Sequence, residues 1–165
     1  MLVTSPVRKA TISDRGRILR MCEENHAENG QFSYSQRKVE GMVDRAFNNG
    51  GAVIGVVGRE VIEGMILLLI SQFWYTEDWC LEELQNYVSP EFRRSTNAKD
   101  MIRFAKRCSD EIGIPLVIGV VANERLRPKM ELYRRELGDP VGGYFLYSHD
   151  DAIRMRCAQG ILAQA

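Results

Sequence analysis

The chain has 165 residues, of which 45% are hydrophobic and 27% are charged, and its 22 basic residues balance its 22 acidic residues. This composition is typical of one globular domain, here spanning 1–165, which can bury roughly two thirds of its unfolded surface without disulfides or a structural metal. A formal net charge of zero argues against a dedicated nucleic-acid-binding protein, because a basic face usually shows in the totals.

Neither a membrane span nor an export signal is expected. The longest apolar run, VIEGMILLLISQFW, is interrupted by Glu63 and Gly64 and is too short to cross a bilayer, so it is better interpreted as a buried strand. The first residues, MLVTSPVRKATISD, lack the apolar core of a signal peptide. The four cysteines are far apart and form no C-x-x-C pair, which predicts reduced thiols, no metal site and a cytoplasmic protein.

The first half of the chain predicts a strand, two helices and a hairpin. Alternation in PVRKATI indicates a strand, and Ser13 or Asp14 is the expected cap of a helix that ends at Gly30. A second helix, capped by Ser35, is predicted from apolar residues at helical spacing: Val39, Met42, Val43, Ala46 and Phe47. Two apolar strands follow, joined by a turn at 58–60.

The second half predicts strands alternating with helices. A turn near YTED leads to the strand WCLEELQNYVS, and after a polar loop a helix begins near Ala98 and ends at Gly113. PLVIGVVAN is the next strand, PKMELYRREL a helix with Pro128 in its first turn, and PVGGYFLYS a last strand. Residues 149–165 predict a C-terminal helical tail.

This order of elements indicates the α+β class. We expect a central mixed, mostly antiparallel sheet of about six strands with helices on both faces, and a strand-helix-strand crossover in its second half. The crossover passes through the loop VSPEFRRSTNAKDMI, which is basic and rich in small residues.

The sequence of this loop resembles the signature of the Gcn5-related N-acetyltransferase superfamily, R/Q-x-x-G-x-G/A between a strand and a helix. Six residues occupy its places: Arg93, Arg94, Ser95, Thr96, Asn97 and Ala98. The order of elements from about residue 7 to 147 is also similar to that of the family, as is the helix LYRRELG. The resemblance implies an acyl-CoA N-acyltransferase fold, acetyl-CoA as co-substrate without a metal, and direct transfer to the amine of a small molecule or peptide.

The loop suits a pyrophosphate group because the first backbone N–H groups of a helix have no internal partner and the helix dipole is positive there. Small residues let the amides of 95–98 approach the phosphates, while Arg93, Arg94 and Lys99 add positive charge. The alternative is that Ser95, Thr96 or Asn97 only caps the helix and the arginines are solvated. Thr96 replaces the family's usual glycine, so the loop must keep a negative φ here or bind the cofactor more weakly.

Glu82 is the candidate general base, with Glu83 as the alternative. Six residues separate Glu82 from Val88, about 20 Å of strand at ~3.3 Å per residue, which is roughly the reach of an extended pantetheine arm. One of two adjacent glutamates must point away from the site, and a bulge in the strand would decide which. Either can also be a solvated surface charge.

The resemblance further implies that Tyr133 is the general acid for the leaving thiolate and that Tyr87, Val88 and Asn123 contact the cofactor. Tyr133 can instead be a helix tyrosine that packs on the sheet. His26 is expected to be a structural histidine, and Cys80 lacks an activating partner. Four aromatic residues fall where the family lines its acceptor pocket: Phe32, Tyr34, Trp74 and Tyr75. Five acidic residues near this expected pocket favour a cationic amine as the acceptor: Glu23, Glu24, Glu28, Glu77 and Asp78.

Where most members of the family end with two strands, this chain offers one and then the tail 149–165. An uncovered sheet edge favours aggregation, so we expect the tail either to cover the edge or to mediate a homodimer. Two other functions stay open: a non-catalytic acyl-CoA-binding module, and a structural protein that keeps only the fold.

Overall fold

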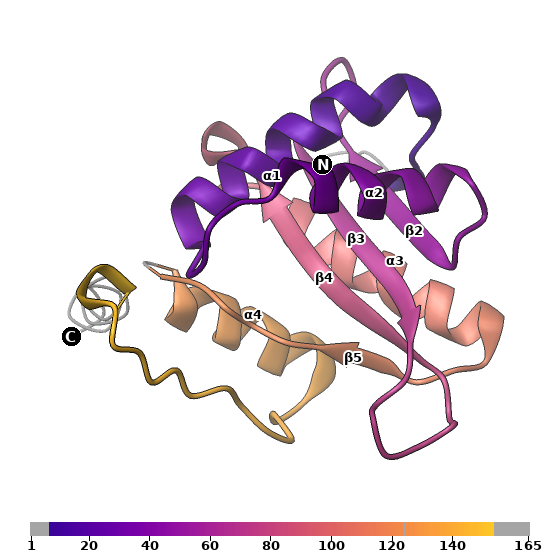
Figure 1. The fold of residues 1–165 in the computed structure, drawn as a ribbon. Helices are drawn as coiled ribbons and strands as arrows, with labels where there is room; N and C mark the ends of the chain where they lie inside the picture. Colours follow the sequence, from indigo (N-terminus) through magenta and orange to yellow (C-terminus); the bar gives the residue numbers. More distant parts are fainter. Residues whose placement is uncertain (1–6, 124, 154–165) are drawn as a thin grey trace.

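The computed structural model describes residues 7–123 and 125–153. Within them, one sheet has the strand order β1-β2-β3-β4-β5. Its strands are β1 (Arg8–Lys9), β2 (Ala52–Val57), β3 (Gly64–Ser71), β4 (Cys80–Val88) and β5 (Leu116–Ile118). Neighbouring strands are antiparallel except β4 and β5, which are parallel (Figure 1).

Four α-helices accompany the sheet in the described residues. They are α1 (Arg15–Asn29), α2 (Gln36–Phe47), α3 (Asn97–Ile112) and α4 (Leu126–Leu137), with short 3-10 turns at Ile12–Asp14 and Pro90–Phe92. Helix α3 connects β4 to the parallel strand β5, as a crossover must. The predicted α+β class and mixed sheet are therefore confirmed.

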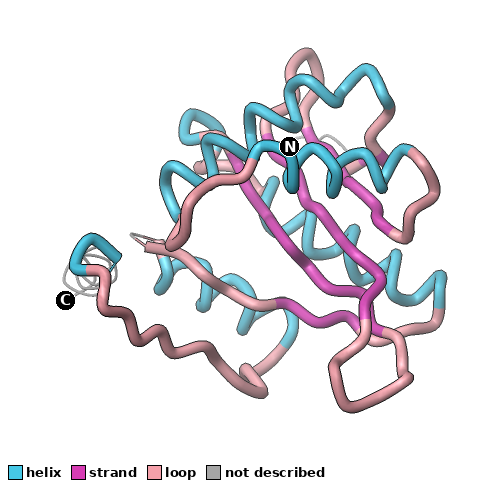
Figure 2. Tube along the Cα trace, viewed as in Figure 1, coloured by secondary structure: helices cyan, strands magenta, loops and turns pink. Residues whose placement is uncertain are grey.

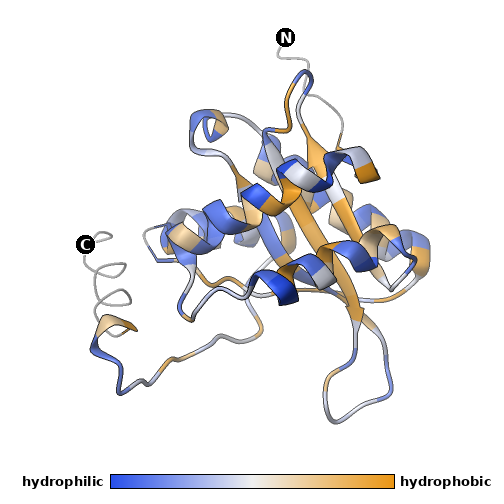
Figure 3. Cartoon of the chain, turned by 45° about the horizontal axis from the view of Figure 1, so that its top comes forward, coloured by the Kyte–Doolittle hydropathy of each residue, from blue (hydrophilic) through white to orange (hydrophobic). Residues whose placement is uncertain are grey.

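Helices cover both faces of the sheet. The core on one face joins α1 and α2 to the sheet through buried residues such as Ile18, Val43 and Leu67. The core on the other face joins α3 to the sheet through residues such as Met101 and Leu68. Figure 3 shows the strands as the hydrophobic centre between helices whose outer sides are hydrophilic.

Local signals explain where the helices begin and end. Asp14 precedes α1 and Ser35 precedes α2, as predicted, but neither side chain makes a capping hydrogen bond to the helix that follows it. Gly113 follows α3 with a φ of 70°, a left-handed conformation that glycine adopts without steric cost. Close packing also needs a glycine on the sheet, because a Cβ at Gly55 would lie 2.7 Å from the ring of Phe104.

The predicted sixth strand is wrong. Residues 140–148 form an extended segment without strand pairing among the described residues, drawn as loop in Figure 2. Several of its side chains are fully exposed, including Val141 and Phe145, because the segment makes no ladder with β5. Of the predicted tail, Asp151–Ile153 are helical, and 154–165 lie outside the described residues.

Candidate active site

Strand β4 contains a bulge at Leu84. Gln85 lies opposite Leu67 and Glu83 opposite Leu68, so the register leaves Leu84 without a partner on β3. A bulge adds one residue to one strand and so changes the face to which the following or preceding residues point. Glu83 consequently shares a face with Leu68, on the side of α3.

β4 and β5 are paired only over a short distance. Residues 81–83 of β4 lie beside residues 116–118 of β5, and β4 then continues to Val88 without this neighbour. The two parallel strands therefore part at their carboxyl ends. Such a divergence is a usual place for a ligand in a sheet with a crossover helix.

The start of α3 faces this opening. The hydroxyl of Ser95 donates to the carbonyl oxygen of Phe92 at 2.6 Å and accepts from the amide of Asn97 at 3.2 Å, which shapes the turn before the helix. The backbone amides of Ala98 and Lys99 donate to no other group within the part of the chain that the structure describes. These two N–H groups remain available to an anion.

Thr96 adopts a φ of −88°, so the loop keeps a negative φ at this position, the first of the two alternatives considered for a threonine here. Its hydroxyl donates to a carboxylate oxygen of Asp100 at 2.6 Å. The hydroxyl is thus engaged within the first turn of α3, and the β-branched side chain causes no backbone strain.

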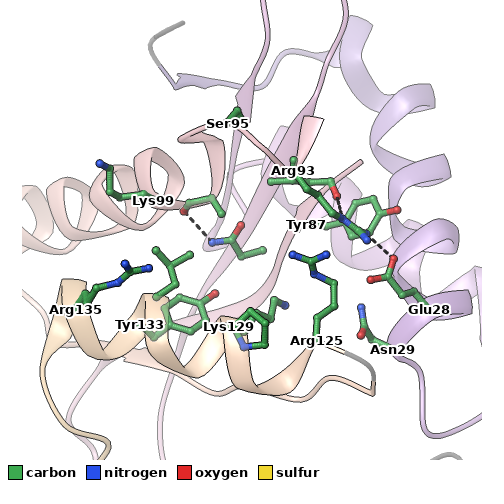
Figure 4. Close-up of a pocket in the computed structure, with 15 residues that line it drawn as sticks. Glu28, Asn29, Tyr87, Arg93, Ser95, Lys99, Arg125, Lys129, Tyr133 and Arg135 are labelled. Carbon is green, nitrogen blue, oxygen red and sulfur yellow. Dashed lines mark hydrogen bonds and ion pairs between the residues drawn. The ribbon is translucent and has the colours of Figure 1, made fainter. Parts of the chain in front are cut away.

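Arg93 connects this loop to α1. Its Nε donates to the carbonyl oxygen of Val88 at 3.0 Å, and its Nη2 donates to Glu28 at 2.5 Å. The guanidinium also lies 5.7 Å from the centre of the Tyr87 ring. Figure 4 shows the Arg93 side chain turned towards Glu28, so part of its charge is already balanced by the protein.

A cavity of about 260 Å³ lies between the end of β4, the start of α3 and the face of α4. Five cationic side chains and one carboxylate line it: Arg93, Lys99, Arg125, Lys129 and Arg135, with Glu28 (Figure 4). The excess of four positive charges makes the cavity suited to a polyanionic ligand. One buried acceptor in its wall, Oδ1 of Asn86, has no partner among the described residues.

Tyr133 and Glu83 meet beside this cavity. The phenol of Tyr133 donates to a carboxylate oxygen of Glu83 at 2.6 Å, and both residues are buried, with 6% and 7% of their surfaces exposed. Burial raises the pKa of Glu83 to about 7, against the opposing effects of the Tyr133 hydrogen bond and the charge of Lys129. Burial, and then the negative charge of Glu83, raises the pKa of Tyr133.

Lys129 lies one helical turn before Tyr133 on α4. Its removal from water lowers the pKa of its ammonium group, although Glu83 and Glu28 attract the charge. Its ammonium makes no ion pair with a described residue. A partly desolvated cation in this state binds an incoming anion strongly.

Glu82 lies on the opposite face of β4. It pairs with Leu69, on the side covered by α1 and α2, and accepts a hydrogen bond from the hydroxyl of Ser71 at 3.0 Å. Glu82 and Tyr133 therefore approach the parting of β4 and β5 from different sides.

The structure brings many of the predicted cofactor residues together and separates others. Those that line the cavity are Tyr87, Val88, Arg93, Ser95, Ala98, Lys99 and Tyr133. Arg94, Thr96, Asn97, Asn123 and Glu82 do not line it. Asn97 donates to Glu63 at 2.8 Å, and Asn123 bonds to the end of α1 through the carbonyl oxygen of Glu28 at 3.0 Å.

The sequence interpretation missed the basic face of α4. Lys129 and Tyr133 are four residues apart, which places them on one side of α4, and Arg125 precedes the helix as its N-cap residue. This spacing was visible in the sequence, but charged residues on a helix are usually solvated, so the spacing alone did not indicate a site.

The other candidates have structural partners or lie at the surface. His26 bonds through Nε2 to the carbonyl oxygen of Phe32 at 2.6 Å and packs on the Tyr34 ring. Trp74 and Tyr75 are exposed in the β3–β4 loop, at the opposite end of β4 from the cavity. Cys80 is buried.

Two of the five acidic residues noted above are paired with arginines. Glu24 pairs with Arg17 and Glu28 with Arg93. In residues 7–123 and 125–153, no group of histidine, cysteine and acidic side chains could hold a metal ion. Within the same residues, the structure has no helix with the length and hydropathy to cross a membrane.

Comparison of the sequence with protein-family models and with curated proteins gives no match. Comparison of the structure with solved structures gives matches over most of the chain. A predicted acetyltransferase from Clostridium acetobutylicum, solved with acetyl-CoA, is 12% identical, with 86% of this chain and 94% of that chain covered and a TM-score of 0.68. The chain has the fold of the Gcn5-related N-acetyltransferases.

Two aminoglycoside-related structures share this acetyltransferase fold. AAC(6')-Iy, in complex with the bisubstrate analog CoA-S-monomethyl-acetylneamine, is 9% identical over 87% of this chain and 97% of that chain, with a TM-score of 0.69. An aminoglycoside acetyltransferase from an uncultured soil metagenomic sample is 16% identical over 87% and 95%, with a TM-score of 0.64. At these identities the likeness concerns the fold.

Proposed function

We propose that the chain is an acyl-CoA-dependent N-acyltransferase that transfers an acetyl group from acetyl-CoA directly to a primary amine in a ternary complex. One observation carries this proposal: the free amides at the start of α3 and the cations of α4 line a single cavity that reaches Tyr133. A polyanion with a reactive group at its far end suits this arrangement of charge and proton donor.

The residues present fit coenzyme A. The amides of Ala98 and Lys99 and the Lys99 ammonium would bind the pyrophosphate, with Arg125, just before the facing helix α4, as a further cation. The unpaired Oδ1 of Asn86 would accept an N–H of the pantetheine arm. When bound, acetyl-CoA supplies the thioester that the amine attacks.

Proton transfers at this site are assigned to side chains on two faces of β4. Glu82, on the α1 and α2 face, would take the proton of the attacking amine, directly or through water. Tyr133, on the α4 side, would donate its phenolic proton to the departing thiolate. Backbone N–H groups of β4 beyond Glu83, where β5 no longer pairs, would steady the oxyanion.

The acceptor that we propose is a small-molecule amine, with a peptide amine as the alternative. Two structures with this fold are named for aminoglycosides, which supports a small polyamine acceptor. Glu23 is an exposed acidic residue of α1 and favours a cationic molecule, whereas Glu77 and Asp78 lie in the β3–β4 loop, away from the cavity. We further propose a cytoplasmic enzyme, which the free thiols of Cys22, Cys80 and Cys108 support.

We also propose a homodimer formed through 140–148. This segment has no charged residue, and its exposed side chains include Val141, Tyr144, Phe145 and Tyr147. A second copy offers an identical uncharged segment with unpaired backbone groups, so a two-fold axis would let the two segments cover each other.

Isothermal titration of acetyl-CoA and of free coenzyme A into the purified protein tests the proposed function. Lys99→Ala should weaken binding of both ligands about 10-fold, the usual effect of one ionic contact. Lys38→Ala is the matched control, because Lys38 is exposed on α2 and removes the same charge. Binding by the native protein that is unaffected by Lys99→Ala would contradict the assigned cofactor site.

A screen of amines for thiol release then separates catalysis from simple binding. Release that depends on both acetyl-CoA and an amine supports the transferase. Cofactor binding without release by any amine would indicate a non-catalytic binding module, and absence of binding by the folded protein would leave only a structural role.

A further inference from the structure

The hydrogen bond between Tyr133 and Glu83 constrains the proposed acid. Tyr133 comes from α4 and Glu83 from the bulged part of β4, and their oxygens lie 2.6 Å apart. A phenol has a single hydrogen to donate, and an ionised carboxylate can only accept. When Glu83 is ionised, the one hydrogen of Tyr133 is therefore held by Glu83.

The charged groups around this pair come from three parts of the fold. Lys129 of α4 attracts the carboxylate of Glu83. The Lys129 ammonium is in turn attracted by Glu28 of α1 and repelled by Arg93 and Arg125. Asn86 of β4 is a further hydrogen-bonding group near Tyr133. Burial outweighs the attraction of Lys129 and raises the pKa of Glu83 to about 7, so both protonation states are accessible at neutral pH.

In the protonated state the direction of the hydrogen bond reverses. The carboxyl hydrogen of Glu83 then points to the phenol oxygen, and the phenol hydrogen becomes free to point elsewhere. The cavity that Tyr133 lines is the open direction, because Tyr133 is otherwise buried.

We propose that Glu83 is a positioning residue whose protonated form turns the phenol hydrogen of Tyr133 towards the sulfur of the acyl donor. This role rests on the proposed function. It differs from that of a general base, since Glu83 acts through Tyr133 and faces away from Glu82.

Protons move in sequence from Tyr133 to the sulfur, from Glu83 to Tyr133 and from water to Glu83. The O–H bond of Tyr133 breaks as the S–H bond of coenzyme A forms, which leaves a phenolate. The phenolate takes the hydrogen of the Glu83 carboxyl group, and the Glu83 carboxylate takes a proton from water before the next turnover. An ionised Glu83 at the start of the cycle leaves the thiolate without its donor.

Substitutions of Glu83 test this role through the pH dependence of kcat. With acetyl-CoA and an amine from the thiol-release screen, the native rate should show a decline above about pH 7 that reports ionisation of Glu83. Glu83→Ala should lower kcat about 10-fold or more, because nothing then directs the phenol. Glu83→Gln should restore the rate and remove the decline, since its amide donates to the phenol oxygen at every pH.

A second measurement does not need turnover. Carbon NMR of protein labelled at its glutamate carboxyl groups should show one signal that titrates near neutral pH and is missing in Glu83→Gln. Tyr133→Phe should move this midpoint upward, because the lost hydrogen bond favoured the ionised form. A Glu83 signal that is fully ionised from about pH 5 upward would overturn the proposal.

The outcomes distinguish this role from the proposed function. If no amine yields thiol release, the transferase and the role of Glu83 both fail. If transfer occurs but Glu83→Gln keeps the native decline, or fails to restore the rate lost in Glu83→Ala, only the role of Glu83 is overturned.

Discussion

Glu82 and Glu83 are adjacent in the chain, but they lie opposite Leu69 and Leu68 and so face opposite sides of the sheet. The bulge at Leu84 determines which of the two glutamates points towards α4. If the pairing were regular, Leu84 would lie opposite Leu68 and Glu83 opposite Leu69, on the side of α1 and α2. Alternation along β4 therefore separates the proposed base from the carboxyl group that contacts Tyr133, and the bulge decides which glutamate has which place.

The first prediction concerns the proposed base. Glu82→Gln should lower kcat about 100-fold, because a positioned general base contributes roughly this factor, while the affinity for acetyl-CoA stays near the native value. The pH dependence of thiol release, measured at saturating amine, checks it: the variant should regain rate as the pH approaches the pKa of the amine. Native kcat in Glu82→Gln would remove Glu82 from the mechanism.

The second prediction follows from the raised pKa of Glu83. Its folded-state pKa is about 7 against an ordinary 4.5, so the folded state binds this proton more tightly and stability falls as pH rises from about 4.5 to 7. Glu83→Gln does not ionise and so avoids this loss. The free energy of unfolding of the variant, relative to that of the native protein, should therefore be higher at pH 8 than at pH 5 by up to about 3 kcal/mol. Urea unfolding at both pH values measures the difference. If Glu83→Gln changes the free energy of unfolding by the same amount at pH 5 and at pH 8, the pKa of Glu83 is not raised by folding.

The third prediction concerns the proposed acid. Tyr133→Phe should lower kcat about 10- to 100-fold, with the dissociation constant for acetyl-CoA changed little, because the phenol hydrogen acts on the leaving thiolate. The variant should also lose about 1 to 3 kcal/mol of stability, since Glu83 loses its buried partner. Stopped-flow thiol release and thermal melting measure the two effects. Tyr75→Phe, at an exposed tyrosine of the β3–β4 loop, is the matched control.

Elements with strong local signals could be predicted from the sequence. Helix α3 ends at Gly113 because glycine adopts the left-handed φ of this position without steric cost, and α2 begins after Ser35, although the Ser35 side chain makes no capping hydrogen bond. The loop around Ser95 could also be assigned, since a strand, a small polar turn and a helix follow one another directly.

Features that depend on distant partners could not be predicted in the same way. The segment 140–148 is apolar enough for a strand, but a strand also needs a ladder, and β5 ends at Ile118, short of the predicted residue 123. The faces of Glu82 and Glu83 depend on a register that no local pattern encodes. The distance from Lys129 to β4 depends on how α4 packs.

The fourth prediction concerns acid stability. Arg8 donates to both carboxylate oxygens of Asp14, at 2.7 and 2.9 Å, and holds the pKa of Asp14 at about 2, below its ordinary 3.8. The contribution is present above about pH 4 and is lost as pH falls towards 2. Asp14→Asn should therefore cost about 1 to 2 kcal/mol at pH 7, since Arg8 is half exposed, and progressively less below about pH 4.

Urea unfolding of Asp14→Asn between about pH 7 and pH 3 provides the measurement. Asp44→Asn is the comparison, because Asp44 also pairs with an arginine, Arg15, but at a more exposed site, so its effect should be smaller. A cost of Asp14→Asn that does not change with pH would show that the ion pair with Arg8 is not its source.

The fifth prediction concerns assembly. If two copies pair through 140–148, Phe145→Glu places two carboxylates near the two-fold axis, and their repulsion and desolvation should convert the dimer to a monomer. Light scattering after size-exclusion chromatography, over a range of concentrations, reads the mass directly. Val61→Glu changes an exposed hydrophobic residue in the β2–β3 connection and should leave the dimer intact. A native protein that is monomeric throughout this range would contradict the interface, whereas the cavity beside Tyr133 would be unaffected, since 140–148 contributes no residue to it.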